Sequence, residues 1–379
     1  MKHIYLDYAA TSPVHPEVFA AMKPYYESQF GNPSSIHHFG RQARRGLDES
    51  RELIAKAIGA SFDEIIFTSG GTEADNLAII GYATAHKEKG NHLITTKIEH
   101  HGVLHAFEFL EKQGFAVTYI DVDESGVVSP FEISNALRDD TILVSCMLGN
   151  NEVGTVQPVK TISELLSEHE AVLHTDAVQA FGMEVINVDE LGVDFLAVSG
   201  HKLNGPKGIG FLYARKGLVF SPLLHGGEQE RKRRAGTENV AAVIGLQKAV
   251  ELSIENIDEK RSLYEGYRQE ILKVFKEQNI QYEVNGSSNH YLPHILNVSF
   301  PGLSVESLLM NLDLEGVAVS SGSACTAGSI DPSHVLTAMF KDESRSHSAI
   351  RFSFGYGLTI DDVKEAAIRT AKVIHRLMK

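Results

Sequence analysis

The chain has 379 residues, of which 43% are hydrophobic and 22% are charged, and these proportions exclude a fibrous repeat or a disordered chain. Acidic residues outnumber basic ones by 49 to 35, a formal charge of −14, which argues against direct nucleic-acid binding because phosphate backbones attract clustered Lys and Arg. The length favours two domains, since one domain usually has about 100 to 200 residues.

The N-terminus has no apolar core of the kind found in signal peptides, and no stretch approaches the roughly 18 uninterrupted apolar residues of a membrane helix. We therefore expect a cytoplasmic protein without membrane contact. Only two cysteines occur, Cys146 and Cys325, too few for a disulfide scaffold or a four-cysteine zinc site. We expect no metal site, and one cysteine could be a reactive thiol.

Short apolar runs alternate with helical patterns from Glu64 to Tyr213. This alternation indicates a largely parallel α/β sheet. The run 210–213 follows its predecessor too closely for a crossover helix, so we expect it to return antiparallel and the sheet to be mixed. The other predicted strands are 64–68, 92–96, 115–120, 141–148, 171–176 and 195–199.

A long helical pattern from about 238 to 276, rich in Glu and Lys, is expected to bridge to a second unit that begins near Tyr282. In that unit we predict strands at 295–299, 317–320 and 350–353, with helices at 304–315 and 359–378. We assign residues 13–255 to a large cofactor-binding domain, and residues 1–12 and 256–379 to a smaller α+β domain.

The run 68–74, TSGGTEA, stands where a predicted strand ends and a helix begins. Free N–H groups at a helix start favour a phosphate, and glycines let the backbone approach it closely. The run matches neither the Walker loop nor the dinucleotide fingerprint, so a different phosphate ligand is expected. A tight turn with Thr72 as N-cap is an alternative that satisfies the same donors.

Asp176 and Lys202 each follow a further predicted strand, at the position where open α/β sheets bind ligands. Asp176 could pair with a cationic ring nitrogen, with Gln179 one helical turn on, or it could merely cap a helix. A lysine in a partly desolvated cleft can form a Schiff base, although an isolated lysine is normally a solvated surface residue. A phosphate cradle, a carboxylate and a lysine together make a pyridoxal-phosphate (PLP) site.

Ten segments spread over nearly the whole chain strengthen this interpretation: YLDYAAT (5–11), GNPSSIH (31–37), TSGGTEADN (68–76), EH (99–100), NNEVG (150–154), HTDAVQ (174–179), SGHK (199–202), RAGTEN (234–239), SSGSAC (320–325) and RFS (351–353). In these segments the chain resembles cysteine desulfurases of the NifS/IscS type, within the class-V aminotransferase family. The resemblance implies a fold-type I PLP enzyme.

The resemblance also implies roles in holding PLP. Lys202 would form the Schiff base, Asp176 would keep the pyridine nitrogen protonated, and Gln179 would face the phenolic oxygen. Thr237 would reach the phosphate from a neighbouring subunit, which implies a homodimer. The remaining cofactor contacts would come from Gly71 and, at the phosphate, from Thr72, Ser199 and His201.

Further roles concern the substrate. His100 would stack on the ring and shuttle protons, since an ordinary histidine pKa near 6.5 suits both directions of transfer. Its neighbour His101 would serve as a helix cap or packing residue. Asn151, which would also contact the cofactor, and Arg351 would bind the substrate carboxylate, Arg351 with a two-pronged geometry.

Cys325 lies in a run of small residues from 320 to 329, a loop that could carry a thiol to the cofactor and away again. A free thiol is only a few per cent thiolate at pH 7, so activation by a base or by the substrate is expected. Cys146, inside the predicted apolar strand, is expected to be buried and inert. The basic cluster 231–234 could be a solvated turn or, as its position before Thr237 favours, an active-site rim at the subunit interface.

These features predict conversion of L-cysteine to L-alanine, with the sulfur held as a persulfide on Cys325. The protein acceptor would be an iron–sulfur scaffold or a tRNA-thiolating enzyme, and the sequence leaves that choice open. A selenocysteine lyase or an aminotransferase is the nearest alternative within the same fold. A sulfur-relay scaffold that acts by docking partners is the alternative from another class.

Overall fold

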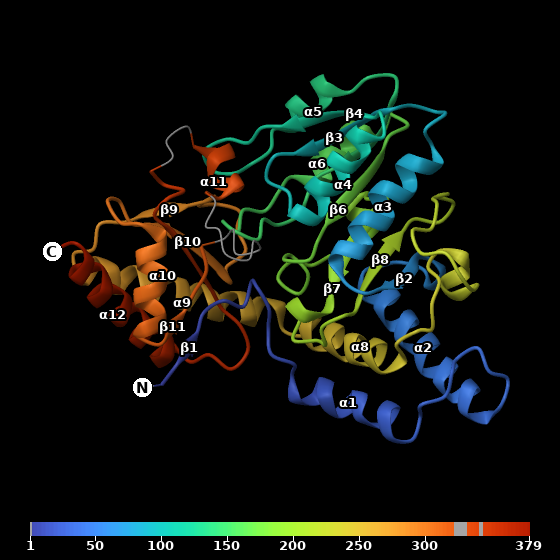
Figure 1. Cartoon of the computed structure of the whole chain (residues 1–379), viewed down its shortest axis with the longest axis horizontal. Coiled ribbons are helices and arrows are strands. Elements are labelled where there is room, and N and C mark those ends of the chain that lie inside the picture. The colour runs from blue at the N-terminus through green and yellow to red at the C-terminus, as the bar shows by residue number, and fades with distance from the viewer. Residues whose placement is uncertain (1, 322–331, 341–343) are drawn as a thin grey trace.

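A seven-stranded sheet forms the centre of the larger part of the protein (Figure 1). The structure, a computed structural model, describes residues 2–321, 332–340 and 344–379. Along the sheet the strand order is β2-β8-β7-β6-β5-β3-β4. The strands are β2 (Ile65–Thr68), β3 (His92–Thr96), β4 (Ala116–Ile120), β5 (Thr141–Ser145), β6 (Val172–Asp176), β7 (Phe195–Ser199) and β8 (Gly210–Ala214).

Strand directions confirm the predicted mixed sheet. The pairs β7–β6, β6–β5, β5–β3 and β3–β4 are parallel, whereas β8 is antiparallel to both of its neighbours, β7 and β2. Two successive reversals leave β2 running in the same direction as β7. The C-terminal ends of β2, β6 and β7 therefore lie at one edge of the sheet.

Helices cover both faces of this sheet. Within β7, Phe195 and Ala197 join a core formed with α3 (Gly71–Ala85) and α4 (His101–Lys112), while Leu196 and Val198 join the opposite core. Burial on both faces explains why the strands read as continuous apolar runs in the sequence. Helices that contribute to the opposite core are α2 (His38–Ala57), α6 (Val159–Leu166) and α8 (Val240–Ile254).

Three shorter or peripheral helices complete this part of the chain. The first, α1 (Pro16–Glu27), packs on α8, while α5 (Pro130–Ala136) packs on α6. The third is the single turn α7 (Val188–Leu191), which also contacts α6.

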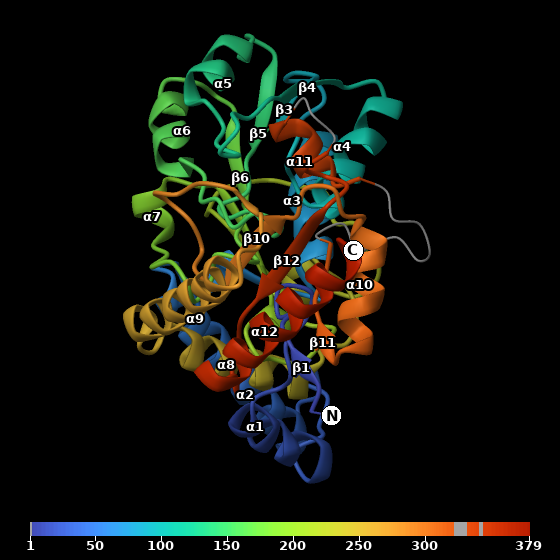
Figure 2. The same ribbon diagram turned by 90° about the vertical axis from the view of Figure 1, so that its left-hand side faces the viewer.

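The second part of the chain contains an antiparallel sheet of order β12-β10-β9. Figure 2 views the protein from the side of this part, with β10 and β12 labelled. Its core joins Leu296 and Phe352 from the sheet to Phe275 and Ile374 from the helices. The N-terminal strand β1 (Ile4–Tyr5) pairs in parallel with β11 (Val317–Ala318). The other elements are α9 (Ile257–Glu277), β9 (Glu283–Asn285), β10 (Ile295–Ser299), α10 (Val305–Leu314), α11 (His334–Met339), β12 (Ala349–Ser353) and α12 (Ile360–Leu377).

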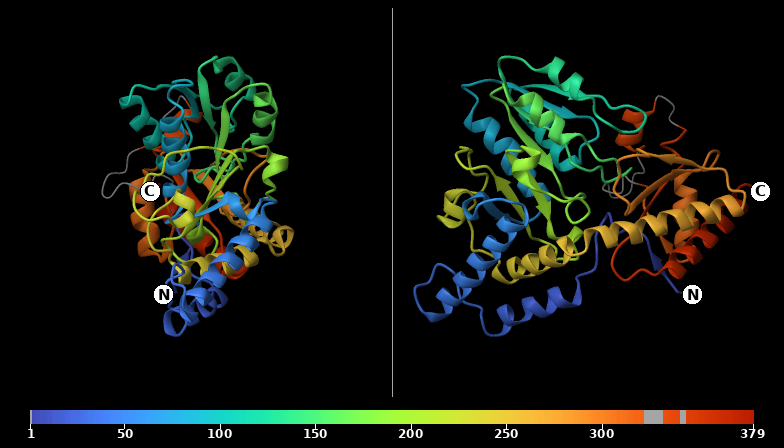
Figure 3. Two further views of the ribbon diagram at one scale, coloured as in Figure 1. Left: turned by 90° about the vertical axis from the view of Figure 1, so that its right-hand side faces the viewer. Right: turned by 180° about the vertical axis from the view of Figure 1, so that it is seen from behind.

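The predicted bridging helix consists of two helices. Asn256, between α8 and α9, has a φ of +53°, in the left-handed region, so the helical hydrogen-bond ladder is interrupted there. Figure 3 shows α9 continuing from α8 towards the second sheet. The predicted helical stretch over 238–276 is therefore interrupted at Asn256, and the path of the chain between the two sheets follows the prediction.

Other differences concern short elements and strand ends. The sequence did not predict β1, β9 or α11, and β5 ends at Ser145 rather than at Leu148. Within the described ranges no helix is long and apolar enough to cross a membrane. The division at residues 12/13 and 255/256 remains a prediction, whereas the α/β fold class is confirmed.

Candidate active site

A cavity of about 520 Å³ opens at the sheet edge where β2, β6 and β7 end. Its volume suits a drug-sized or cofactor-sized ligand. Of the residues proposed from the sequence, Thr237 is exposed and does not line this cavity, and Cys325 lies outside the described ranges. The ten that line it are Gly71, Thr72, His100, Asn151, Asp176, Gln179, Ser199, His201, Lys202 and Arg351.

Asp176 is the last residue of β6 and is only 5% exposed. Its Oδ1 accepts a hydrogen bond of 2.8 Å from the Val178 N–H, and no helix begins there, so the helix-capping alternative is wrong. Burial raises the pKa of Asp176 to about 6, opposed by the Val178 N–H and the Lys202 ammonium. Asp176 therefore remains mostly ionised at neutral pH and can pair with a cation in the cavity.

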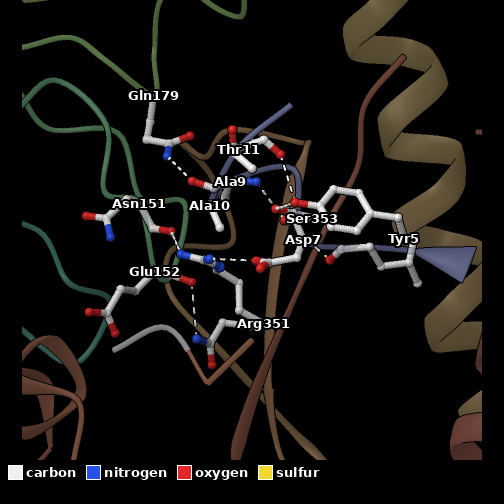
Figure 4. Close-up of polar contacts among 12 residues, drawn as sticks. Tyr5, Asp7, Ala9, Ala10, Thr11, Asn151, Glu152, Gln179, Arg351 and Ser353 are labelled. Carbon is white, nitrogen blue, oxygen red and sulfur yellow. Dashed lines mark hydrogen bonds and ion pairs between the residues drawn. The ribbon is translucent and has the colours of Figure 1, made fainter. Parts of the chain in front are cut away.

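Lys202 ends the 3₁₀ turn Gly200–Lys202, which directly follows β7. Its Nζ donates to the carbonyl oxygens of Ala9 (2.6 Å) and Ala10 (2.7 Å). Gln179 also reaches the N-terminal segment, because its Nε2 donates to the Ala9 carbonyl at 2.9 Å (Figure 4). Gln179 stands in a turn and not on a helix, contrary to the prediction.

Arg351 lies on β12 and is 3% exposed. One terminal nitrogen donates to the Asn151 carbonyl at 2.8 Å, and the other donates to Oδ1 of Asp7 at 2.9 Å (Figure 4). The Nε atom is buried without a hydrogen-bond partner. The guanidinium is thus held in place and still has donor capacity for a carboxylate. Sequence reasoning assigned no role to Asp7, although its segment YLDYAAT was one of the ten recognised.

The start of α3, where the sequence predicts a phosphate cradle, lines the cavity. The N-cap position is occupied by Gly70, so no side chain caps the helix, and Thr72 lies within its first turn. The alternative with Thr72 as N-cap is therefore wrong. A Cβ atom added at Gly71 would lie 2.8 Å from Cγ2 of Val178, so a larger residue would intrude on the cavity wall. Uncapped N–H groups beside a narrow space suit a phosphate.

His201 also lines the cavity, and its Nδ1 is 3.1 Å from Oγ1 of Thr11. Burial lowers the pKa of His201 to about 4, with further lowering by Lys202, Lys207 and His100. The ring is therefore neutral at pH 7 and can hydrogen-bond a phosphate without adding charge.

His100 is the N-cap of α4, and its Nδ1 accepts a hydrogen bond from the Gly102 N–H at 3.0 Å. Burial lowers the pKa of His100 to about 4, assisted by Lys202, His334 and His105. The ring is thus neutral at pH 7, with its proton on Nε2. His101 does not cap the helix but packs on neighbouring imidazoles, at 5.2 Å from the His105 ring.

A buried acidic residue that the sequence analysis missed lies behind Asp176. Asp75, on α3, lines the cavity, and its Oδ1 is 3.3 Å from Nε2 of His174. Neither of these atoms has a hydrogen-bond partner of good geometry. Burial, followed by the carboxylates of Asp176 and Glu99, raises the pKa of Asp75 well above its usual range. A cationic ring nitrogen beside Asp176 would offset this concentration of acids, so the residues present fit PLP.

Cys146 is fully buried directly after β5 and is a free cysteine. Burial, with a contribution from Glu99, raises the pKa of its thiol well above the ordinary value, as expected for an inert thiol. Among the residues that the structure describes, no group of three or more His, Cys, Asp or Glu side chains could hold a metal ion.

Comparison with known proteins identifies the family. The model of the class-V aminotransferase family matches residues 4–365. The IscS 1 protein of Bacillus subtilis (strain 168) is 60% identical over 378 residues, which cover 100% of both chains. The cysteine desulfurase IscS of Dictyoglomus turgidum is 50% identical over 376 residues, or 99% of this chain and 95% of that protein.

Solved structures agree with the sequence comparisons. A NifS-like protein matches with a TM-score of 0.93 at 35% identity and covers 99% of this chain and 100% of its own. A structure of SspA in complex with cysteine matches with a TM-score of 0.82 at 37% identity, over 93% of this chain and 98% of its own. The chain therefore belongs to the class-V aminotransferase family and, within it, to the pyridoxal-phosphate-dependent cysteine desulfurases.

Proposed function

We propose that this protein converts L-cysteine to L-alanine in the cytoplasm and passes the sulfur, held as a persulfide on Cys325, to a protein acceptor. The observation that carries the proposal is the meeting of Lys202, Asp176 and the uncapped start of α3 in one cavity. Together they offer an amine, a carboxylate and a phosphate cradle to one ligand.

The cofactor is held by residues from several strand ends. PLP, when bound, supplies an electron sink for the bond broken at the substrate Cα. Asp176 keeps a proton on the pyridine nitrogen, and the Gln179 amide faces the phenolic oxygen. Gly71 contacts the cofactor beside the phosphate, which is held by Thr72, Ser199 and His201. Thr237 completes the phosphate site from the second subunit of a homodimer.

Substrate is oriented by Arg351 and Asn151. Arg351 donates to the cysteine carboxylate while Asp7 and the Asn151 carbonyl hold its guanidinium. The Lys202 amine would remove the Cα proton. His100 uses Nε2 for the proton shuttle, since its Nδ1 is occupied by the Gly102 N–H.

Sulfur transfer requires a thiolate. The Cys325 thiolate attacks the substrate sulfur, so an S–S bond forms as the substrate C–S bond breaks. The electron pair of the broken bond remains with the alanine skeleton, which takes up one proton at Cβ and regains one at Cα, and Cys325 keeps the persulfide. An iron–sulfur scaffold protein or a tRNA-thiolating enzyme then removes the outer sulfur.

The proposal is tested by replacing Cys325 with alanine and measuring alanine formation from L-cysteine with a thiol reductant present. We expect turnover to fall to background while the yellow absorbance of bound PLP is retained. Undiminished turnover would refute the role of Cys325. Turnover that depends on an added keto acid would favour an aminotransferase, and a protein unable to acquire the yellow absorbance would favour a docking scaffold.

A label-transfer experiment distinguishes the acceptors. The enzyme is loaded with ³⁵S from labelled cysteine and mixed separately with an iron–sulfur scaffold protein and with a tRNA-thiolating enzyme. The acceptor is the one that removes the label. If both proteins removed the label only as fast as a free thiol does, delivery of sulfur to a specific protein acceptor would be contradicted.

A further inference from the structure

Glu73 places an acidic side chain in the proposed phosphate cradle. It lies on the first turn of α3, next to Thr72, and lines the same cavity. Its Oε2 accepts a hydrogen bond of 2.8 Å from the Ser69 N–H. An uncompensated carboxylate here would repel a phosphate dianion, because like charges in a partly desolvated site interact strongly.

Arg234 compensates this charge with two-pronged geometry. Its Nε is 2.8 Å from Oε1 of Glu73, and its second terminal nitrogen is 3.2 Å from Oε2. The side chain of Arg234 is only 22% exposed and that of Glu73 only 16%, so the pair is partly shielded from solvent screening. Paired donors of this kind fix the orientation of a carboxylate as well as its charge.

The ionisation of both groups agrees with this geometry. Burial acts to raise the pKa of Glu73, but the hydrogen bonds from Arg234 and Ser69 outweigh it and hold the pKa below its ordinary value. The hydrogen bond to Glu73 raises the pKa of Arg234. The two groups therefore form an ion pair at neutral pH.

The segment that carries Arg234 is anchored on both sides. Before it, Glu230 has a left-handed φ of +45° and forms a buried ion pair with Arg51, 2.6 Å between the closest atoms. After it, the Gly236 N–H donates to Oε1 of Gln229 at 3.1 Å. Thr237, which we propose to reach the partner's cofactor, follows directly. One segment thus contacts the local phosphate cradle and leads into the residue proposed for the neighbouring one.

We infer that Arg234 is a positioning residue for the phosphate group of the cofactor. It neutralises Glu73 and holds that carboxylate against the Ser69 N–H, so that the start of α3 accepts a dianion. The inference rests on the proposed function, since it takes this cradle as the place of the PLP phosphate. It assigns the RAGTEN segment a role within its own subunit besides the role proposed for Thr237.

The test measures the affinity of cofactor-free full-length protein for PLP and, in parallel, for pyridoxal, which has the same aldehyde and ring but no phosphate. For Arg234→Gln we expect PLP affinity to fall by at least about tenfold at low ionic strength, with pyridoxal affinity unchanged. Glu73→Gln/Arg234→Gln, which removes both charges, is expected to return PLP affinity to within about threefold of wild type. Glu73→Gln alone is expected to bind PLP at least as tightly as wild type.

Arg233→Gln is the matched control. It removes the same charge one position earlier, from a side chain that lies over the Phe220 ring and donates to the Asp63 carbonyl, not to Glu73. Thermal unfolding of each cofactor-free variant reports folding independently. A double variant as weak as Arg234→Gln, or an equal loss for pyridoxal and PLP, would overturn the inference. Wild-type protein that binds no PLP would instead refute the proposed function.

Discussion

The two walls of the cavity differ in how the chain builds them. The strand-end wall, formed by Thr72, Asp176, Ser199 and Lys202, consists of residues that end a strand of the large sheet or follow it closely. The N-terminal wall consists of Ala9, Ala10, Thr11 and Arg351. Its parts lie at opposite ends of the sequence and meet where the Ala9 N–H donates to Oγ of Ser353 at 2.9 Å.

The strand-end wall is held by its backbone, because its residues end or closely follow strands of a sheet that is buried on both faces. The N-terminal wall is held by side chains: Lys202 and Gln179 hold the Ala9 carbonyl, and Asp7 holds Arg351. We expect the chemistry to depend on the strand-end wall and the binding of substrate to depend on the N-terminal wall. Four predictions test this division.

Lys202→Ala should have the largest effect. Loss of the amine removes both the Schiff base and the proposed Cα base, so we expect alanine formation to fall by at least about a thousandfold. Ultraviolet–visible spectra should lack the imine band even when PLP is present. The control is Lys207→Ala, which removes another lysine that lines the cavity and should retain the band. Equal losses in the two variants would contradict the assignment.

Changes at Asp7 should affect substrate binding more than turnover. Asp7→Ala removes one of the two anchors of the Arg351 guanidinium, and a hydrogen bond between charged groups contributes roughly 1.5 to 3 kcal/mol. We expect KM for L-cysteine to rise by about tenfold with kcat within about threefold. Asp7→Asn, which keeps an acceptor oxygen, should raise KM less. A fall in kcat at unchanged KM would mean that Asp7 acts in the chemical step and not in substrate binding.

Burial of Asp176 predicts an unusual pH dependence of stability. Its pKa is about 6 in the folded protein against an ordinary value of 3.8. Its contribution to the free energy of unfolding is thus fully present below pH 3.8 and is lost as the pH rises through 6. The free energy of unfolding of cofactor-free Asp176→Asn, measured relative to wild type, should therefore rise between about pH 4 and pH 8, by up to about 3 kcal/mol. The measurement is denaturant unfolding of both proteins at the two pH values. An unchanged difference in unfolding free energy between variant and wild type would contradict the prediction.

Cys146→Ala should have the smallest effect. The thiol is buried and Cys146 does not line the cavity, so we expect alanine formation within about twofold of wild type. The free energy of unfolding should fall by about 1 kcal/mol because a small cavity is left. A loss of activity comparable to that expected for Cys325→Ala would contradict the assignment of Cys146 as an inert thiol.

Local sequence was sufficient for the strand-end wall. An apolar run followed by glycines, a carboxylate or a lysine indicates a strand and its end, and parallel strands bring their C-terminal ends to one edge. This pattern predicts Lys202 and Asp176 as site residues, the family resemblance adds Ser199, and all three line one cavity. Their roles at the cofactor remain predictions.

Tertiary structure alone decided the N-terminal wall and the protonation of the site. Nothing near Arg351 in the sequence identifies Asp7 as its partner, since 344 positions separate them, and the partner of Glu73, Arg234, is 161 positions away. The pKa of His100 falls to about 4 because of burial and of charges from several elements, where the sequence led us to expect an ordinary histidine. Short-range patterns determine which elements form, whereas ion pairs and desolvation depend on which elements pack together.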